Sequence, residues 1–214
     1  MTGITYDYME EYLKALIPES KAVLKDLESY AKENSIPIVQ KESANFLQLM
    51  VSMQRPKKIL ELGTAIGYSA ILMSEASFNK AEITTIEREA SMIEKAQKNF
   101  DDHGYTNINI IQGEALEVLS SLDEEYDLIF MDAGQGHYNH FFPLCLKLLA
   151  KDGIIVADNV LFRGMVANNA LLKKRKITIV KRMRKYLMEV NADPNLITSV
   201  IPMGDGIAVT KRRF

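Results

Sequence analysis

The sequence has few of the features that would set it apart from ordinary globular proteins of a reducing compartment. Its 214 residues include one cysteine, Cys145, which excludes an internal disulfide. No apolar run approaches the roughly 20 residues of a membrane span, and the N-terminus lacks the basic and then apolar pattern of a signal peptide. No internal repeat and no linker rich in glycine, serine or proline divides the chain. These absences predict a cytoplasmic protein with a single domain over residues 1–214.

Charge is low overall but unevenly distributed, with a formal net charge of −2. Residues 1–150 contain 13 Lys and Arg against 23 Asp and Glu, whereas residues 151–214 contain 13 against 5. Eight Lys and Arg fall within residues 173–185 with no acidic residue among them. Such a split points weakly to a polyanionic partner. The alternative interpretation is that residues 173–185 form an amphipathic helix whose charges only face solvent.

The spacing of apolar residues predicts an α/β fold. Helical patterns at about 6–16, 18–34 and 41–53 form an N-terminal helical part within residues 1–55. From residue 56 onward, short apolar runs alternate with amphipathic stretches, which is typical of a parallel sheet with helices on both faces. The expected strands are 58–62, 82–86, 108–111, 127–131, 153–157, 196–202 and 206–211, and the expected helices between them are 68–74, 89–103, 114–121, 138–149 and 168–190. The sequence MGDG between the last two strands is a hairpin signal.

The stretch ILELGTAIGYS, residues 59–69, predicts a strand, a glycine-rich turn and the start of a helix. Gly63 and Gly67 would let the backbone turn tightly and approach a ligand. Their spacing is G-x-x-x-G rather than G-x-G-x-x-G, so a dinucleotide oxidoreductase is the weaker interpretation. Glu87 ends the second strand, where a carboxylate can accept hydrogen bonds from two ribose hydroxyls. Ala115 follows the third strand, where a small side chain leaves room for a flat base. The ends of the first three strands could therefore together hold a nucleoside.

Oxygen-bearing side chains follow the fourth and fifth strands. Asp132 ends the fourth strand, and Asp158 and Asn159 end the fifth. Since adjacent strands lie about 5 Å apart, these side chains should converge. Two carboxylates and a carboxamide suit Mg²⁺ or another octahedral divalent cation, and without a cation the carboxylates would repel each other. The alternative is that Asp158 and Asn159 only end a strand or open a turn.

Together, ILELGTAIGYS, Glu87, YDLIFMDA and VADNVLFRG resemble the S-adenosylmethionine-dependent O-methyltransferases of the catechol and caffeoyl-CoA type, from about residue 36 onward. More narrowly, IPIVQKES, DNVLFRGMV and the basic segment after Lys173 resemble the bacterial tRNA 5-hydroxyuridine methyltransferases. The resemblance implies a Rossmann-like class I methyltransferase fold with a seven-stranded, mostly parallel sheet and a reversed last strand, and homodimers are common in this family. It also implies S-adenosylmethionine beside Glu61, Gly63, Ser69, Glu87, Ala115 and Asp132, and a divalent cation on Asp132, Asp158 and Asn159.

One position departs from the catechol-type pattern. These enzymes carry a lysine three residues after the first metal aspartate, proposed as the base that deprotonates the acceptor hydroxyl, and this chain has Gln135 there. Glutamine cannot take a proton at neutral pH. His137 could replace the base, since imidazole titrates in the right range, although a lone histidine near a helix start is more often structural. A third possibility is that a cation on Asp132 acidifies the acceptor enough without any base.

The acceptor implied by the narrower resemblance is the wobble-position 5-hydroxyuridine of tRNA, which would become 5-methoxyuridine. Its 5-hydroxyl and 4-carbonyl are neighbouring oxygens, as in a catechol. Lys174, Lys181 and Lys185 are the predicted tRNA-binding residues, on one face of a helix. A small catechol or caffeoyl-CoA-like acceptor is the alternative, and a non-catalytic S-adenosylmethionine-binding protein is the rival of another class.

Overall fold

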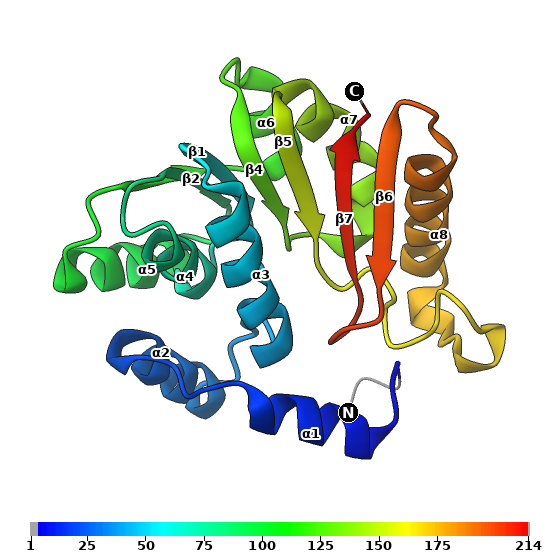
Figure 1. Ribbon diagram of the computed structural model, residues 1–214, viewed down its shortest axis with the longest axis horizontal. Coiled ribbons are helices and arrows are strands. Elements are labelled where there is room, and N and C mark those ends of the chain that lie inside the picture. The colour runs from blue at the N-terminus through cyan, green and yellow to red at the C-terminus, as the bar shows by residue number, and fades with distance from the viewer. Residues whose placement is uncertain (1–3, 214) are drawn as a thin grey trace.

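The computed structural model describes residues 4–213 (Figure 1). The strands are β1 (Lys58–Leu62), β2 (Glu82–Glu87), β3 (Ile108–Gln112), β4 (Tyr126–Met131), β5 (Leu149–Ala157), β6 (Leu196–Ile201) and β7 (Ile207–Arg212). The α-helices are α1 (Asp7–Leu16), α2 (Ala22–Glu33), α3 (Lys41–Gln54), α4 (Tyr68–Ala76), α5 (Ala90–His103), α6 (Ala115–Ser121), α7 (Tyr138–Leu148) and α8 (Ile177–Ala192). Short 3₁₀ turns occur at η1 (Gln135–His137), η2 (Asn169–Leu171) and η3 (Lys174–Lys176).

The seven strands form one sheet in the order β3-β2-β1-β4-β5-β7-β6. The pairings among β1 to β5 are all parallel, whereas β7 runs antiparallel to both β5 and β6. This confirms the predicted Rossmann-like sheet with its reversed last strand. The chain enters at β1 and builds outward first to β2 and β3 and later to β4 and β5. Ligand crevices in open α/β sheets form where the strand order reverses in this way, beyond the carboxyl ends of the strands.

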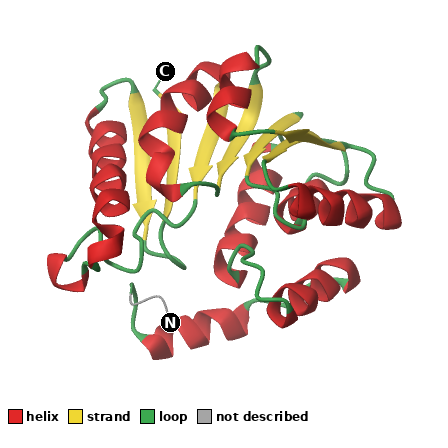
Figure 2. Ribbon diagram, turned by 180° about the vertical axis from the view of Figure 1, so that it is seen from behind, coloured by secondary structure: helices red, strands yellow, loops and turns green. Residues whose placement is uncertain are grey.

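Two apolar cores cover the two faces of the sheet, because successive side chains of a strand point to opposite faces. In β4, Leu128 and Phe130 face the core shared with α2 to α5, whereas Ile129 and Met131 face the core shared with α6, α7 and α8. Figure 1 shows α3 and α4 on the first face, and Figure 2, seen from behind, shows the helices that cover the second. Cys145 is fully buried in the second core, where burial raises the pKa of its thiol.

The expected helix over 168–190 is wrong in its first part. The chain makes the short turns η2 and η3 there, and α8 begins at Ile177. Lys173 is extended, with a φ of −88° and a ψ of 133°, so the chain is not helical between η2 and η3. The guanidinium of Arg184 also holds the irregular segment, since it donates hydrogen bonds to Met165 O, Val166 O and Asn169 Oδ1 at 2.7–3.0 Å. The second expected helix is also shorter, since α2 begins at Ala22 rather than at residue 18.

Helix α1 is attached to the sheet region through α3. The ammonium of Lys14 on α1 lies 2.7 Å from Glu10 and 3.3 Å from Glu42 on α3, and both carboxylates are buried. Lys41 Nζ donates a hydrogen bond to Ile17 O at 2.9 Å. These contacts fix α1 below the carboxyl ends of the strands (Figure 1). Across residues 4–213, no helix is both long enough and apolar enough to cross a membrane.

Candidate active site

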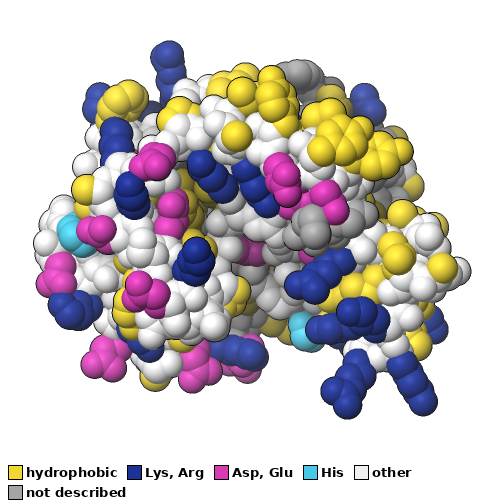
Figure 3. All heavy atoms as spheres, turned by 90° about the horizontal axis from the view of Figure 1, so that it is seen from below, with side chains coloured by type: hydrophobic (Ala, Val, Ile, Leu, Met, Phe, Trp, Pro, Cys, Tyr) yellow, Lys and Arg dark blue, Asp and Glu magenta, His cyan; other side chains and the backbone are white. Residues whose placement is uncertain are grey.

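The carboxyl ends of the parallel strands open into one cavity of about 1400 Å³. We call its two parts the β1–β3 half, lined by residues that follow β1, β2 and β3, and the β4–β5 half. The β4–β5 half is lined by residues that follow β4 and β5, by the start of α3 and by Asp205 in the β6–β7 hairpin. Figure 3 looks at this side of the molecule, where Lys and Arg side chains gather around a hollow.

The glycines of the β1–β3 half are required by geometry. Gly63 has a φ of +99°, and a Cβ there would lie 3.0 Å from the Cβ of Ala133. Gly67 has a φ of +86°, and a Cβ there would lie 2.5 Å from the ring of Phe100. Glycine therefore lets the turn after β1 pass close to the chain leaving β4 and to α5, in a left-handed conformation that other residues rarely adopt.

Glu87 lies at the end of β2, lines the cavity and holds the glycine-rich turn. Its Oε2 accepts a hydrogen bond from the backbone N–H of Ala65 at 3.0 Å. Its Oε1 accepts from the N–H groups of Arg88 and Glu89 at 2.9 and 3.0 Å. The carboxylate is thus fixed in place, and it remains only partly buried, so part of it still faces the cavity.

Two other residues expected in this half, Glu61 and Ser69, lie behind the cavity wall rather than on it. Glu61 is fully buried, and its Oε2 accepts a hydrogen bond from Thr85 Oγ1 at 2.5 Å. Within residues 4–213, its Oε1 has no hydrogen-bond partner. Burial raises the pKa of Glu61 to about 7, and hydrogen bonds from Ser69 and Thr85 oppose part of that rise. Gly63, Glu87 and Ala115 do line the cavity.

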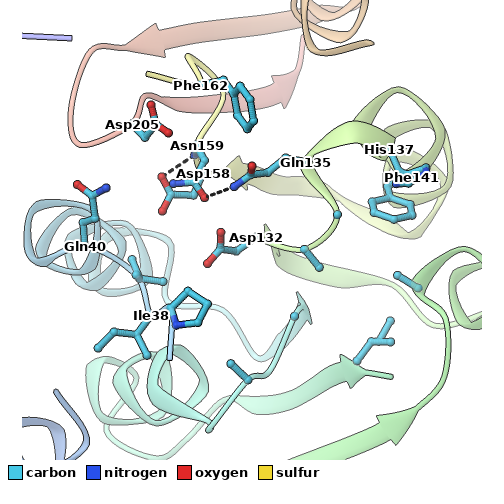
Figure 4. A pocket seen from close by; sticks show the side chains of 18 of the residues that line it. Ile38, Gln40, Asp132, Gln135, His137, Phe141, Asp158, Asn159, Phe162 and Asp205 are labelled. Atoms are coloured by element: carbon cyan, nitrogen blue, oxygen red, sulfur yellow. Dashed lines mark hydrogen bonds between the residues drawn. The ribbon is translucent and has the colours of Figure 1, made fainter. Parts of the chain in front are cut away.

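In the β4–β5 half, sheet pairing brings the three oxygen-bearing residues together. Met131 and Ala157 are partners in the parallel register, so Asp132 and Asp158 follow at neighbouring positions, with Asn159 next to them (Figure 4). Asp158 N donates to Met131 O at 3.0 Å, which continues the sheet pairing by one residue. All three residues line the cavity.

The carboxylate of Asp158 is nearly inaccessible, with 1% of the residue exposed. Its Oδ1 accepts hydrogen bonds from Asn159 N at 2.7 Å and from Ser43 Oγ, on α3, at 3.4 Å. Its Oδ2 is buried and has no donor within the described part of the chain. A buried carboxylate oxygen without a donor is costly, so this oxygen is suited to a cation.

Electrostatics support the same conclusion. Burial raises the pKa of Asp132, and the negative charges of Asp158 and Glu61 raise it further. Burial also raises the pKa of Asp158, with smaller contributions from the charges of Asp205 and Glu42, although its hydrogen bonds from Asn159 and Ser43 lower it. Each carboxylate therefore disfavours the ionised form of the others, as expected where a positive charge belongs.

Gln135, at the position of the missing lysine, and His137, the candidate replacement base, are arranged differently. Gln135 points toward Asn159, and its Nε2 donates to Asn159 Oδ1 at 2.9 Å (Figure 4). The ring of His137 instead lies against Phe141, with centroids 6.0 Å apart, and points away from the Asp158 cluster. Within residues 4–213, the His137 side chain makes no capping hydrogen bond to α7. This geometry does not favour His137 as the base.

Several residues of the site cannot be found by sequence reasoning, whether they line the cavity or, like Ser43, bond a residue that does. Ser43 comes from α3, and Asp205 comes from the β6–β7 hairpin, so no local motif places either one beside Asp158. Arg163, Lys173 and Lys176 also line the β4–β5 half, and Lys176 Nζ lies over the ring of Phe162, 5.7 Å from its centroid. In the sequence, Lys173 and Lys176 are marked only by the run of cations at residues 173–176. That run predicts a charged helix there and does not predict that the two lysines line a cavity.

The predicted tRNA-binding lysines lie outside the cavity. Lys174, Lys181 and Lys185 are exposed, but Lys174 lies in η3 and the other two lie on α8, so they do not share one helix face. Lys185 Nζ is 3.6 Å from Glu189. Two other cations of the segment form hydrogen bonds within the fold. Arg184 binds the irregular segment before α8, and Arg182 donates to Gly136 O at 3.2 Å.

Comparisons with known proteins define the family. A family model described as O-methyltransferase matches residues 15–213. A catechol O-methyltransferase from Niastella koreensis is 35% identical over 173 residues, which cover 78% of each chain. A Staphylococcus aureus protein with a provisional caffeoyl-CoA O-methyltransferase assignment has a crystal structure that superposes with a TM-score of 0.88 at 31% identity, covering 97% of this chain and all of that one. A caffeoyl-CoA O-methyltransferase from Populus kitakamiensis is 28% identical over 83% of this chain and 78% of its own.

The chain therefore belongs to the O-methyltransferase family, among the members of the catechol and caffeoyl-CoA type. It is an S-adenosylmethionine-dependent O-methyltransferase, which decides against the non-catalytic alternative.

Proposed function

We propose that this enzyme methylates one of two neighbouring oxygens on its acceptor, with a divalent cation held by Asp132, Asp158 and Asn159. The single observation that carries the proposal is the buried Oδ2 of Asp158, which has no donor in residues 4–213, in a cavity that Asp132 and Asn159 also line. When bound, such a cation supplies the positive charge that lowers the pKa of an acceptor hydroxyl.

The proposed donor set contains an amide beside its two carboxylates. No group of three or more His, Cys, Asp or Glu side chains suited to a metal occurs in the described residues 4–213, so the amide of Asn159 is needed to complete the set. Two carboxylates and one carboxamide oxygen leave coordination positions free for water and acceptor, as Mg²⁺ prefers. Three protein ligands thus suit a cation that takes part in binding the acceptor.

The protein side of the reaction is mainly positioning. Glu87 and the turn after Gly63 would hold S-adenosylmethionine in the β1–β3 half, with Ala115 beside its base. Asp132, at the junction of the two halves, would set the distance between the methyl donor and the acceptor. An in-line displacement needs the attacking oxygen, the methyl carbon and the leaving sulfur aligned, so fixing both substrates on adjacent strand ends lowers the barrier.

Activity in the presence and absence of chelator tests the cation. We expect EDTA to abolish methyl transfer and Mg²⁺ to restore it. Isothermal titration with S-adenosylhomocysteine in the same buffers is the control, since cofactor binding to the β1–β3 half should persist in EDTA. Full turnover in excess chelator would show that the three oxygen residues have another role.

For the acceptor, we propose the wobble-position 5-hydroxyuridine of tRNA. Support comes from the cavity mouth, where Arg163, Lys173 and Lys176 line the β4–β5 half and could contact phosphates on either side of an inserted nucleotide. A small catechol is the second candidate, favoured by the Niastella koreensis relative, which is named a catechol O-methyltransferase.

Two matched triple variants separate these acceptors. One replaces the mouth cations Arg163, Lys173 and Lys176 with alanine, and the other replaces the outer lysines Lys174, Lys181 and Lys185. If tRNA is the acceptor, removal of each cation that binds a phosphate should reduce the salt slope of tRNA binding by about 0.7–0.9. We expect the mouth variant to raise the KM for tRNA more than the outer variant. Salt-independent turnover of tRNA, or faster turnover of a free catechol, would favour the small molecule.

We also infer a homodimer. Helix α1 exposes large apolar side chains, with Tyr8 65%, Tyr12 60% and Leu16 60% accessible. Their i, i+4, i+8 spacing places them on one side of the helix. Light scattering after size exclusion should give twice the 24.2 kDa chain mass, and Tyr12→Lys should reduce it to the monomer.

A further inference from the structure

The loop after β4 directs a glutamine toward the proposed cation site. Gly134 adopts a left-handed φ of +57°, and the chain then enters η1 at Gln135. From there Gln135 reaches across to the end of β5, and its Nε2 donates to Asn159 Oδ1 at 2.9 Å (Figure 4). The contact joins the ends of two adjacent strands through side chains 24 residues apart in sequence.

The donor matters because a carboxamide has two different ends. Only the oxygen of Asn159 can bind a cation, whereas its NH₂ group would present hydrogens to it. A hydrogen bond donated by Gln135 requires the oxygen end of Asn159 as its acceptor, and it holds Oδ1 where both residues line the cavity. A carbonyl oxygen has two lone pairs, so one can accept from Gln135 while the other remains available to a cation.

The surrounding structure fixes both partners of this hydrogen bond. Asn159 has a left-handed φ of +58°, and its N–H is held by Asp158 Oδ1. On the other side, α8 packs against η1: a Cβ on Gly136 would lie 3.3 Å from Ile179 Cγ1, and Arg182 Nη1 donates to Gly136 O. The turn that carries Gln135 is therefore held in place by its packing against α8.

We propose that Gln135 is a positioning residue: it orients the Asn159 carboxamide so that its oxygen faces the cation, in place of the lysine base of catechol-type relatives. The inference rests on the proposed cation site. Hydrogen-bond partners that orient metal ligands contribute about 10- to 100-fold to metal affinity. The effect should thus appear in cation binding, without any acceptor or cofactor present.

Binding of Mn²⁺, followed by the loss of the free-ion electron paramagnetic resonance signal, measures this contribution. Gln135→Met keeps the length of the side chain and removes the donor, and we expect Mn²⁺ affinity to fall at least tenfold. Gln135→Asn keeps an amide that is one methylene too short, and it should give a similar loss. The control is Gln97→Met, because Gln97 is exposed on α5, does not line the cavity and should leave Mn²⁺ affinity unchanged.

A double-mutant cycle distinguishes orientation from general support of the fold. In an Asn159→Asp background both terminal atoms are oxygens, so no end has to be selected. In that background, Gln135→Met should change Mn²⁺ affinity by less than about twofold. In the protein that keeps Asn159, the same substitution should lower Mn²⁺ affinity tenfold or more. Equal losses in the two backgrounds would overturn the orienting role.

The possible failures are distinguishable. If the unaltered protein binds Mn²⁺ and Asp158→Asn removes that binding, the cation site stands. In that case, wild-type affinity in both Gln135 variants would overturn the positioning role alone. If the unaltered protein shows no Asp158-dependent Mn²⁺ binding, the cation site fails, and the role of Gln135 fails with it.

Discussion

The two halves of the cavity are built in different ways. The β1–β3 half comes from one stretch of chain, residues 59–116, in which each strand is followed at once by its ligand-facing turn, and Glu87 accepts its hydrogen bonds from backbone groups. The β4–β5 half is assembled from α3, two strand ends, the segment up to Lys176 and the β6–β7 hairpin. One half is a local motif, and the other is a product of tertiary structure.

The halves also differ in charge. The floor of the β4–β5 half concentrates buried carboxylates, Asp158 and Asp205, while Lys173 and Lys176 line its mouth. In the β1–β3 half, the Glu87 carboxylate on the wall is only half-buried and accepts backbone hydrogen bonds, and the fully buried carboxylate of Glu61 lies behind the wall. Excess negative charge at the floor suits a cation, and positive charge at the mouth suits an anionic acceptor. The half proposed to bind the cofactor can stay constant while the other half sets the substrate.

The largest effect is expected from breaking the β4–β5 half at Asp158. Asp158→Ala should lower kcat/KM by about a thousandfold, roughly 4 kcal/mol of transition-state stabilisation. The melting temperature in EDTA should stay the same or rise, because burial already disfavours the ionised carboxylate. Asp152→Ala, an exposed change at the other end of β5, is the control. A variant of Asp158 that retained activity would remove it from the site.

The next largest effect is a pH dependence of the free energy of unfolding that arises from protonation of Glu61. Its pKa is about 7 in the folded chain against 4.5 ordinarily, so between these values the folded state holds a proton that the unfolded state releases. The free energy of unfolding therefore falls as pH rises from 4.5 to 7, by about 3 kcal/mol from this group.

Glu61→Gln removes that dependence. The variant should gain little stability relative to wild type at pH 5 and about 3 kcal/mol at pH 8, as measured by urea unfolding. The charge of Glu61 also raises the pKa of Asp132, so the same comparison is made in an Asp132→Asn background to isolate Glu61. A difference that does not change with pH would show that Glu61 is ionised throughout.

A smaller effect is expected from breaking the β1–β3 half at Glu87. Glu87→Ala should weaken S-adenosylmethionine binding at least tenfold, about 1.5–3 kcal/mol, because it removes both the hydrogen bonds to the ribose and the support of Ala65. Binding of Mn²⁺ to the other half should not change. Glu89→Ala is the control, since only its backbone contacts Glu87. Calorimetry showing unchanged cofactor affinity would remove Glu87 from the site.

The same contrast explains how much could be predicted from the sequence. Gly63, Asp132 and Asp158 each follow a strand whose apolar run is plain in the sequence, and Glu87 ends one. Their positions at the cavity therefore follow from parallel topology. Ser43 and Asp205 reach the site only through the packing of α3 and of the hairpin, which no local pattern encodes. The helix expected from residue 168 begins at Ile177 for a related reason: hydrogen bonds from Arg184 to distant carbonyls outweigh local helical spacing.

The smallest effect tests how firmly the strand ends of the β4–β5 half are joined. Tyr138 Oη lies 2.8 Å from Met131 O, at the end of β4, and 3.0 Å from Asp158 O, after the end of β5. The hydroxyl has one proton, so it donates to one of these carbonyl oxygens at a time and lies within hydrogen-bonding distance of both. Tyr138→Phe should lower the free energy of unfolding by about 1–2 kcal/mol, because a buried hydrogen bond is removed. At this chain length, each kcal/mol corresponds to about 2–4 °C in melting temperature.

The neighbouring Tyr186 provides the matched comparison. Its ring meets that of Tyr138 edge-on, with centroids 5.7 Å apart, and it is equally buried. Its hydroxyl has no hydrogen-bond partner among the residues that the structure describes. Tyr186→Phe should therefore leave the melting temperature unchanged or raise it, since it removes an unsatisfied buried group. Only Tyr138→Phe should also weaken Mn²⁺ binding, because only that hydroxyl links the strand ends that carry Asp132 and Asp158. Equal destabilisation by the two substitutions would mean that the hydroxyl of Tyr138 does not join them.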